Sequence, residues 1–177
     1  MFRILVVFPF LLIIACSTGS YLKPISSMGS YSTVNPSCPG AKKVLEIRPV
    51  NNKSLTVRVH AELPNKPHSD GTRLIVNVIF RGVTERVTVE AEFPYAQVTL
   101  QNGEVKSVLL PFFEKPYIHG ESDYKYGYWS PESLISAGSV ENFTVLLPTI
   151  YIDGQQVNLP TVEFKLDQDK YYPVLNC

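Results

Sequence analysis

Leu55-Thr56-Val57-Arg58-Val59-His60-Ala61-Glu62 is the segment that decides the fold, because its apolar and polar side chains alternate without exception. Successive side chains of a β-strand point to opposite faces of a sheet, so the apolar residues share one face and the polar residues share the other. The segment therefore predicts a half-buried strand with one dry face and one wet face.

Two segments further along the chain extend this pattern. Residues 73–80 are apolar on both parities, which predicts a central strand that is covered on both faces. Residues 87–93 alternate again, with an apolar set made of Val87, Val89, Ala91 and Phe93.

Two dipeptides predict hairpins. Asn102-Gly103 favours a type I′ turn, because that turn requires positive φ at both central residues, and it is expected to join residues 96–100 to 105–110. Asp153-Gly154 predicts a second hairpin between residues 143–152 and 157–166. Proline cannot donate a hydrogen bond to a ladder, so Pro148 and Pro160 are expected at bulges or edge positions.

One short helix is expected after the strands of the first hairpin. Ser130 is a suitable N-cap, Pro131 and Glu132 suit a first turn, and Gly138 can end the helix. The full pattern predicts an all-β chain, an antiparallel β-sandwich (Ig-like or similar) of about seven to nine strands with one short helix. A small β-barrel is the alternative.

Composition narrows the function. The 177 residues carry a formal net charge of zero, which argues against a nucleic-acid partner. The sequence contains no phosphate-binding loop, nucleophile elbow, Cys-x-x-Cys or His-Glu-x-x-His motif, so it gives no sign of an enzyme and no cofactor is expected.

The N-terminus carries a targeting signal. Arg3 precedes an apolar run over residues 4–14, which is shorter than the ~20 residues of a membrane-spanning helix. Ala15 and Cys16 follow, and then small polar residues. This arrangement resembles the lipobox of bacterial lipoprotein precursors.

The resemblance implies that residues 1–15 are a signal peptide and that Cys16 is acylated by diacylglyceryl and palmitate-type chains. Two or more such chains hold a protein firmly on a lipid bilayer. We expect the protein to be anchored in a bacterial membrane, the outer membrane in the first place. The domain is then expected in the periplasm or at the cell surface. The alternative is a plain secreted protein in which Cys16 has no such role.

After the lipobox, residues 16–40 are rich in Ser, Gly, Pro and Asn, and we expect the lipidated cysteine to be followed by a flexible tether. A single β domain is expected over residues 41–177. Cys38 and Cys177 are then the remaining thiols, and an oxidising compartment favours a disulfide between them. Two unrelated thiols, or a bond from Cys177 to another molecule, are the alternatives.

The best candidate binding segment is aromatic. Within residues 117–129 it includes Tyr117, Tyr124, Tyr126, Tyr128 and Trp129. Rings with a polar tip suit protein interfaces and sugar stacking, and the glycines and acids among them indicate an exposed loop. The alternative is that the rings pack under the loop and stabilise it.

Each histidine is followed by an acid two residues later, in the pairs His60 and Glu62, His68 and Asp70, and His119 and Glu121, the last with Asp123 nearby. Imidazole and carboxylate are zinc and copper ligands, but a tight site needs three or four protein ligands, so no metal site is predicted.

Two functional hypotheses follow. The first is a non-enzymatic, membrane-anchored envelope lipoprotein that presents its β domain to an envelope protein or a glycan. The second is a hydrolase or metal-binding periplasmic protein that uses His119, Glu121 and Asp123.

Overall fold

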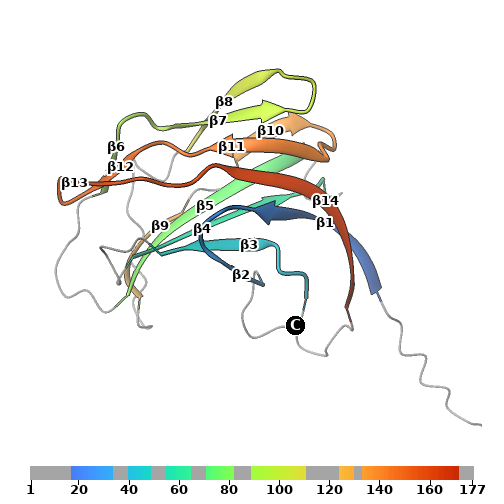
Figure 1. The fold of residues 1–177 in the computed structure, drawn as a ribbon, viewed down its shortest axis with the longest axis horizontal. Helices are drawn as coiled ribbons and strands as arrows, with labels where there is room; N and C mark the ends of the chain where they lie inside the picture. Colours follow the sequence, from blue (N-terminus) through green and yellow to red (C-terminus); the bar gives the residue numbers. More distant parts are fainter. Residues whose placement is uncertain are drawn as a thin grey trace, which may run out of the picture.

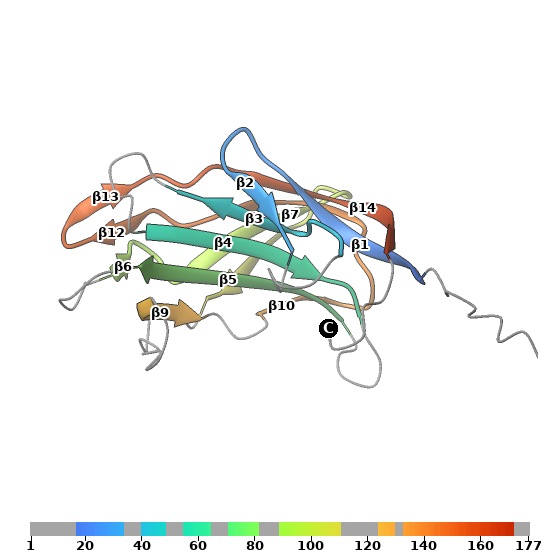
Figure 2. The same cartoon turned by 90° about the horizontal axis from the view of Figure 1, so that it is seen from below.

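The computed structural model describes residues 17–33, 40–48, 55–64, 71–81, 89–110, 124–129 and 133–171. Within these ranges every regular element is a β-strand, and no helix occurs. Two larger antiparallel sheets form the layers of a β-sandwich, as Figures 1 and 2 show from two directions. The predicted all-β sandwich is therefore confirmed, but the described residues form fourteen strands, more than the seven to nine that were expected. The described sheets keep their edge strands, so the barrel alternative is not adopted.

The first layer is a five-stranded sheet. Its strands are, in spatial order, β1 (Ser17–Ile25), β14 (Val162–Tyr171), β11 (Asn142–Leu146), β7 (Tyr95–Leu100) and β8 (Val105–Leu109).

The second layer is a six-stranded sheet. Its main path runs through β10 (Ser133–Ala137), β5 (Gly71–Arg81), β4 (Leu55–Glu62), β3 (Val44–Ile47) and β2 (Ser30–Ser32), and β9 (Tyr124–Trp129) also pairs with β5. The strand over residues 73–80 is central, as predicted, because β5 lies between β4 on one side and β9 and β10 on the other.

A smaller sheet extends from one end of the sandwich (Figure 1). It contains β13 (Gln155–Val157), β12 (Ile150–Ile152) and β6 (Val89–Ala91). Of the strand predicted over residues 87–93, the structure describes Val89–Ala91 as β6 and places Phe93 beyond its end with 62% of its surface exposed. Phe93 is thus not on a dry face, and Val87 lies outside the described residues.

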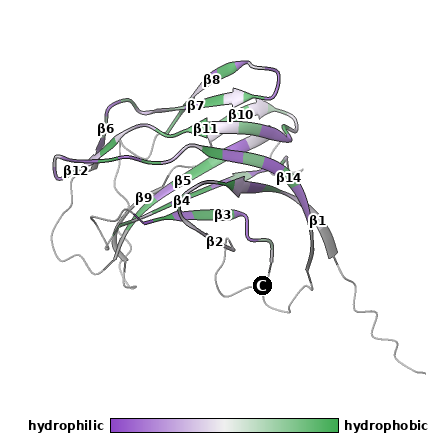
Figure 3. Ribbon diagram, viewed as in Figure 1, coloured by the Kyte–Doolittle hydropathy of each residue, from purple (hydrophilic) through white to green (hydrophobic). Residues whose placement is uncertain are grey.

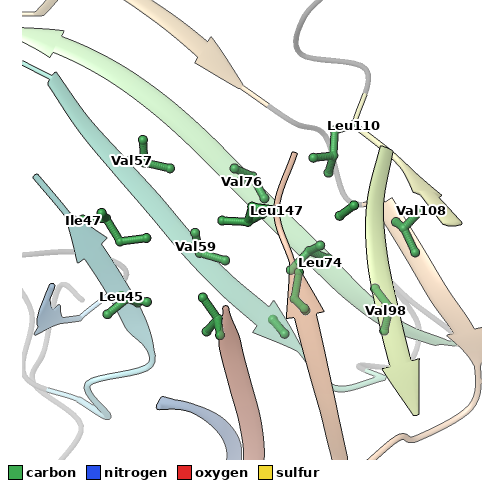
Figure 4. Close-up of a cluster of buried hydrophobic side chains, with 14 of the residues drawn as sticks. Leu45, Ile47, Val57, Val59, Leu74, Val76, Val98, Val108, Leu110 and Leu147 are labelled. Atoms are coloured by element: carbon green, nitrogen blue, oxygen red, sulfur yellow. The ribbon is translucent and has the colours of Figure 1, made fainter. Parts of the chain in front are cut away.

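The core lies between the two larger sheets. Leu45, Val57, Val59 and Val76 project from the six-stranded sheet toward Val98 and its neighbours (Figure 4). Phe143 and Phe164 stack with their ring centroids 5.0 Å apart. Hydrophobic residues therefore alternate with polar ones along many strands in Figure 3, as expected when one face of each sheet packs on the other.

Both predicted hairpin turns exist, but the turn types differ. At Asn102-Gly103 only Gly103 has positive φ (84°), and the amide of Leu100 donates to the carbonyl of Glu104. The loop is therefore a three-residue connection with glycine in the left-handed position, and the type I′ prediction is wrong here. Asp153 (φ 47°) and Gly154 (φ 76°) form the two-residue turn with both φ values positive, between Ile152 and Gln155.

The second hairpin is shorter than predicted, because proline interrupts each arm. Pro148 lies between β11 and β12, and Pro160 lies between β13 and β14. Beyond these breaks the two arms pair again in the five-stranded sheet, where Val145 is opposite Val162. Both prolines thus mark interruptions of the ladder, as expected.

The predicted helix after Ser130 is wrong over residues 133–137, which form β10. Ser133 and Ile135 are buried and Leu134 is exposed, which is the alternation of a strand. An isolated helix of this length is only marginally stable, whereas the edge of β5 supplies backbone hydrogen-bond partners to residues 133–137. Gly138 follows with φ 85°, and residues 130–132 lie outside the described residues.

The predicted tether is also wrong where the structure describes it. Ser17–Ile25 is β1 and pairs with β14 along its whole length, and Ser30–Ser32 is β2 and pairs with β3. Leu22 is fully buried in the core. A Ser-rich and Gly-rich composition does not prevent strand formation when a neighbouring strand satisfies the backbone and a few apolar side chains reach the core.

Candidate functional site

The edges of the sheets are poorly suited to strand addition by a partner. On the edge strand β8, Lys106 lies opposite the buried Val98, on the inner side of the sheet, and pairs with Glu104 at 3.5 Å. A lysine that points inward from an edge strand discourages a second strand from docking. On the edge strand β1, Pro24 offers no backbone donor.

The other layer has blunted edges as well. The pairing of β5 with β9 has a register shift between Phe80 and Arg81. Another register shift occurs within β10, and β2 at the far edge has only three residues. Such irregularities and short edges limit edge-to-edge pairing, so the faces of the sandwich are the better candidate surfaces.

The middle of the outer face of the six-stranded sheet, around β3, β4 and β5, is largely buried, although Leu134 at the β10 edge of this face is 55% exposed. We call this buried part the covered face. It includes Thr56, His60 and Asn77, whose exposed fractions are 4%, 6% and 5%. The prediction that the polar side of residues 55–62 forms a wet face is therefore wrong at Thr56 and His60. Alternation fixes which side chains share a face, but it does not fix whether that face meets water.

Charged groups on the covered face are paired. The Glu46 carboxylate lies 3.3 Å from Nε of Arg58 and accepts a hydrogen bond from the Ser32 hydroxyl at 3.0 Å. Arg58 also donates to the backbone carbonyl of Thr33 at 3.1 Å. Burial of such charges is tolerated because their hydrogen bonds and opposite charges replace water.

His60 is held neutral on this face. Burial is the main cause that lowers the pKa of His60 from 6.5 to about 3, and the positive charges of Lys43 and Arg58 contribute to the same shift. Its Nε2 lies 3.8 Å from the Glu62 carboxylate, and its Nδ1 has no hydrogen-bond partner among the described residues. An imidazole with so low a pKa is a weak base near neutral pH, so His60 does not fit the role of a general base.

The outer face of the five-stranded sheet is open to solvent and carries apolar side chains. We call Tyr95, Leu109 and Leu146 the end patch, and their exposed fractions are 45%, 45% and 52%. Tyr95 is directly opposite Leu109, and Leu146 is opposite Gln97, two residues along the strand from Tyr95. The three side chains are therefore neighbours on one face of rigid strands.

A polar belt separates the end patch from the start of β1 on the same face. It contains two ion pairs, Lys165 with Glu163 at 2.9 Å and Lys23 with Asp167 at 3.0 Å. The hydrogen bond with Lys23 is the main cause that lowers the pKa of Asp167, and the same bond raises the pKa of Lys23.

The belt also contains a shallow depression of about 420 Å³. Its lining residues come from the three middle strands of the sheet and the adjoining turn: Thr99, Leu100, Gln101, Asn142, Phe143, Thr144, Glu163 and Lys165. At its margin the Asn142 amide donates to Gln101 at 3.4 Å.

The aromatic segment chosen from the sequence is partly a strand. Its Tyr124–Trp129 portion forms β9 and pairs with β5, with Asn77 opposite Trp129, so the expected loop is wrong for these residues. Tyr117 lies outside the described residues, and so do His119, Glu121 and Asp123. Whether the aromatic side chains bind a partner stays a prediction.

The remaining predicted sites lie outside the described residues as well, namely the signal segment over residues 1–15, Cys16, Cys38, Cys177, His68 and Asp70. Among the described residues, no three His, Cys, Asp or Glu side chains lie close enough to hold a metal ion. None of the described residues belongs to a helix that is long and apolar enough to span a membrane.

The sequence contained a signal for the end patch. Residues 105–110 are apolar at Val105, Val108, Leu109 and Leu110, that is, on both parities of a strand next to a hairpin turn. In the structure Val108 is buried and Leu109 is exposed. An apolar residue on the second parity of such a strand indicates either a cover or an interaction surface.

Comparisons of the chain with protein-family models, with curated proteins and with solved structures found no match.

Proposed function

We propose that this protein is a non-enzymatic, membrane-anchored lipoprotein of the bacterial envelope, whose β-sandwich binds a partner protein through the end patch. The observation that carries the binding role is the exposure of Tyr95, Leu109 and Leu146 together on one rigid face. The lipobox-like segment that ends in Cys16 supports the anchor.

The end patch has the composition of a protein interface. Tyrosine contributes a large apolar area and a polar tip, and two leucines beside it extend the apolar surface. Their strands are held by backbone pairing on both sides of β7 and β11, so binding orders few flexible groups. The charged belt beside the end patch supplies the polar rim that surrounds many interfaces.

A glycan is the second candidate partner, because the depression offers a different chemistry. Hydroxyl groups of Thr99 and Thr144, the amides of Gln101 and Asn142, and the charges of Glu163 and Lys165 converge there. Such groups form the directional hydrogen bonds that a sugar requires. The hydrolase or metal-binding alternative rests on His119, Glu121 and Asp123 and stays a prediction.

The experiment uses a photo-crosslinking amino acid at Leu109 in the full chain, in intact cells. One defined protein adduct is expected, and it should be lost when Tyr95→Asp or Leu146→Asp is added. Both positions are exposed, so the melting temperature should stay within a few degrees. Gln168→Asp, at an exposed position on β14 far from the end patch, is the matched control and should keep the adduct.

Adducts that survive both Asp variants would contradict the role of the end patch. If a soluble oligosaccharide inhibits adduct formation, and Asn142→Ala removes that inhibition, the glycan candidate would replace the protein partner.

A further inference from the structure

The start of β1 fixes how far the sandwich can move from an anchor at Cys16. Ser17 is the next residue in the chain, and it is already paired with Tyr171 of β14. Consecutive Cα atoms are ~3.8 Å apart, so the anchor residue lies one peptide unit from the sheet. No residue therefore lies between Cys16 and the first paired residue of β1.

The pairing register gives the distance from this point to the end patch. Ile25, Glu163, Thr144 and Thr99 lie side by side in one row across the five-stranded sheet. Ser17 lies eight residues before Ile25 on β1, and Tyr95 lies four residues beyond that row in the same direction, on the antiparallel β7. At ~3.3 Å per residue the separation is about 40 Å along the strands.

The arrangement of the strands places the two regions at opposite ends of the sandwich. β1 begins at one end of the sandwich, and the β12–β13 hairpin lies at the opposite end, beyond the start of β7 (Figure 1).

The polar belt determines which surface can rest on the bilayer. Its two ion pairs are about half exposed, with side-chain exposures of 51% and 39% for Lys23 and Asp167 and 50% and 45% for Lys165 and Glu163. A sandwich lying on this face would remove both pairs from water in order to bury the end patch. Desolvation of paired charges costs free energy, and burial of three side chains that are already about half covered offsets little of that cost.

We infer that the sandwich stands on its β1–β14 end and holds the end patch about 40 Å from the anchor, where it meets a partner protein and not its own bilayer. This inference rests on the proposed anchoring at Cys16. In this orientation the distance between the end patch and the bilayer is set by the length of the strands, and not by the reach of a flexible linker.

The test uses the acylated full-length protein on vesicles of phosphatidylethanolamine and phosphatidylglycerol with an energy-transfer acceptor on the headgroups. A fluorescent amino acid is placed at Glu104, beside the β7–β8 turn, or at Gln155, in the β12–β13 hairpin; both residues are exposed. Energy transfer from position 104 should exceed that from position 155 at least about twofold, because strand length separates the two heights.

A variant with a flexible Gly/Ser segment inserted between Cys16 and Ser17 should lose most of this difference. Equal transfer from both positions in the vesicle-bound wild-type protein would overturn the upright orientation and leave the anchor intact. Failure of the wild-type protein to bind vesicles, with the same result for Cys16→Ala, would instead overturn the anchor, and the inference with it.

The partner is tested by the crosslinker at Leu109 in the same vesicle-bound state. Lipid adducts, or adducts to a second copy of the chain, would overturn a partner protein at this height. Absence of lipid adducts supports the inference, provided that a crosslinker at Thr18, next to the anchor, does give them.

Discussion

The two outer faces of the sandwich differ in how they treat polar and apolar side chains. The covered face of the six-stranded sheet buries Thr56, His60 and Asn77, whereas the open face of the five-stranded sheet exposes Tyr95 and Leu146. Both faces belong to strands whose other side packs into one common core. Side-chain polarity therefore does not tell which face of a sheet meets water.

The difference teaches that the two faces are stabilised by different means. On the covered face Glu46 pairs with Arg58 and Ser32, whereas Nδ1 of His60 and Oδ1 of Asn77 have no hydrogen-bond partner among the described residues. On the open face the comparable ion pairs are half exposed and contribute little, while the apolar residues remain available for contact. The first face supports the fold, and the second is the candidate surface for function.

The largest expected difference between the faces is in their response to acid. Burial holds the pKa of His60 at about 3, against 6.5 in the unfolded chain. Below pH ~6.5 the unfolded chain binds a proton that the folded protein does not, so stability is full above this value and declines toward pH 3, by roughly 4 to 5 kcal/mol in all. Urea unfolding at several pH values measures the decline.

His60→Gln separates this effect from the carboxylates, which titrate in the same range. Glutamine cannot be protonated, so between about pH 7 and about pH 4 the variant should lose roughly 3 kcal/mol less stability than the wild type. Equal losses in the two proteins would show that His60 is not buried in its neutral form.

The next largest effect is expected from removal of a charge on each face. Arg58→Met removes the nearest opposite charge of the Glu46 carboxylate and leaves only the more exposed Arg48, 3.6 Å away, so it should destabilise the protein by about 2 kcal/mol. The matched change on the open face is Lys165→Met, which should cost less than about 1 kcal/mol because its pair is half exposed. Urea unfolding midpoints compare the two, and similar losses would remove the distinction between the faces.

The smallest effect concerns apolar side chains. Ile75, which is opposite His60 on the covered face, is buried, and Ile75→Val should cost about 1 kcal/mol through the lost methyl group. Leu146→Ala removes more atoms but from an exposed position, and should change stability by no more than about 0.5 kcal/mol. A larger loss for Leu146→Ala would show that the end patch is covered in the free protein.

Much of the architecture followed from local chemistry. The alternation over residues 55–62 identified β4, the double-sided apolar run identified the central β5, and the glycine dipeptides located two hairpin turns. The helix prediction was wrong for a reason that lies outside residues 130–138. Capping residues favour a helix end locally, but they do not show that the edge of β5 provides backbone hydrogen-bond partners for Ser133–Ala137. The end patch was missed for a similar reason, since exposure is a property of the packed layers.

The sequence by itself determined which residues share a face and where the chain turns, because these depend on neighbours within a few residues. An anchor at Cys16 stays a prediction. Only the tertiary structure decided that Ser17–Ile25 is a strand and which outer face is largely buried. The reason is that β1 takes its hydrogen bonds from β14, at the other end of the sequence, as in the pairing of Ser17 with Tyr171. Burial likewise depends on segments brought together only by folding.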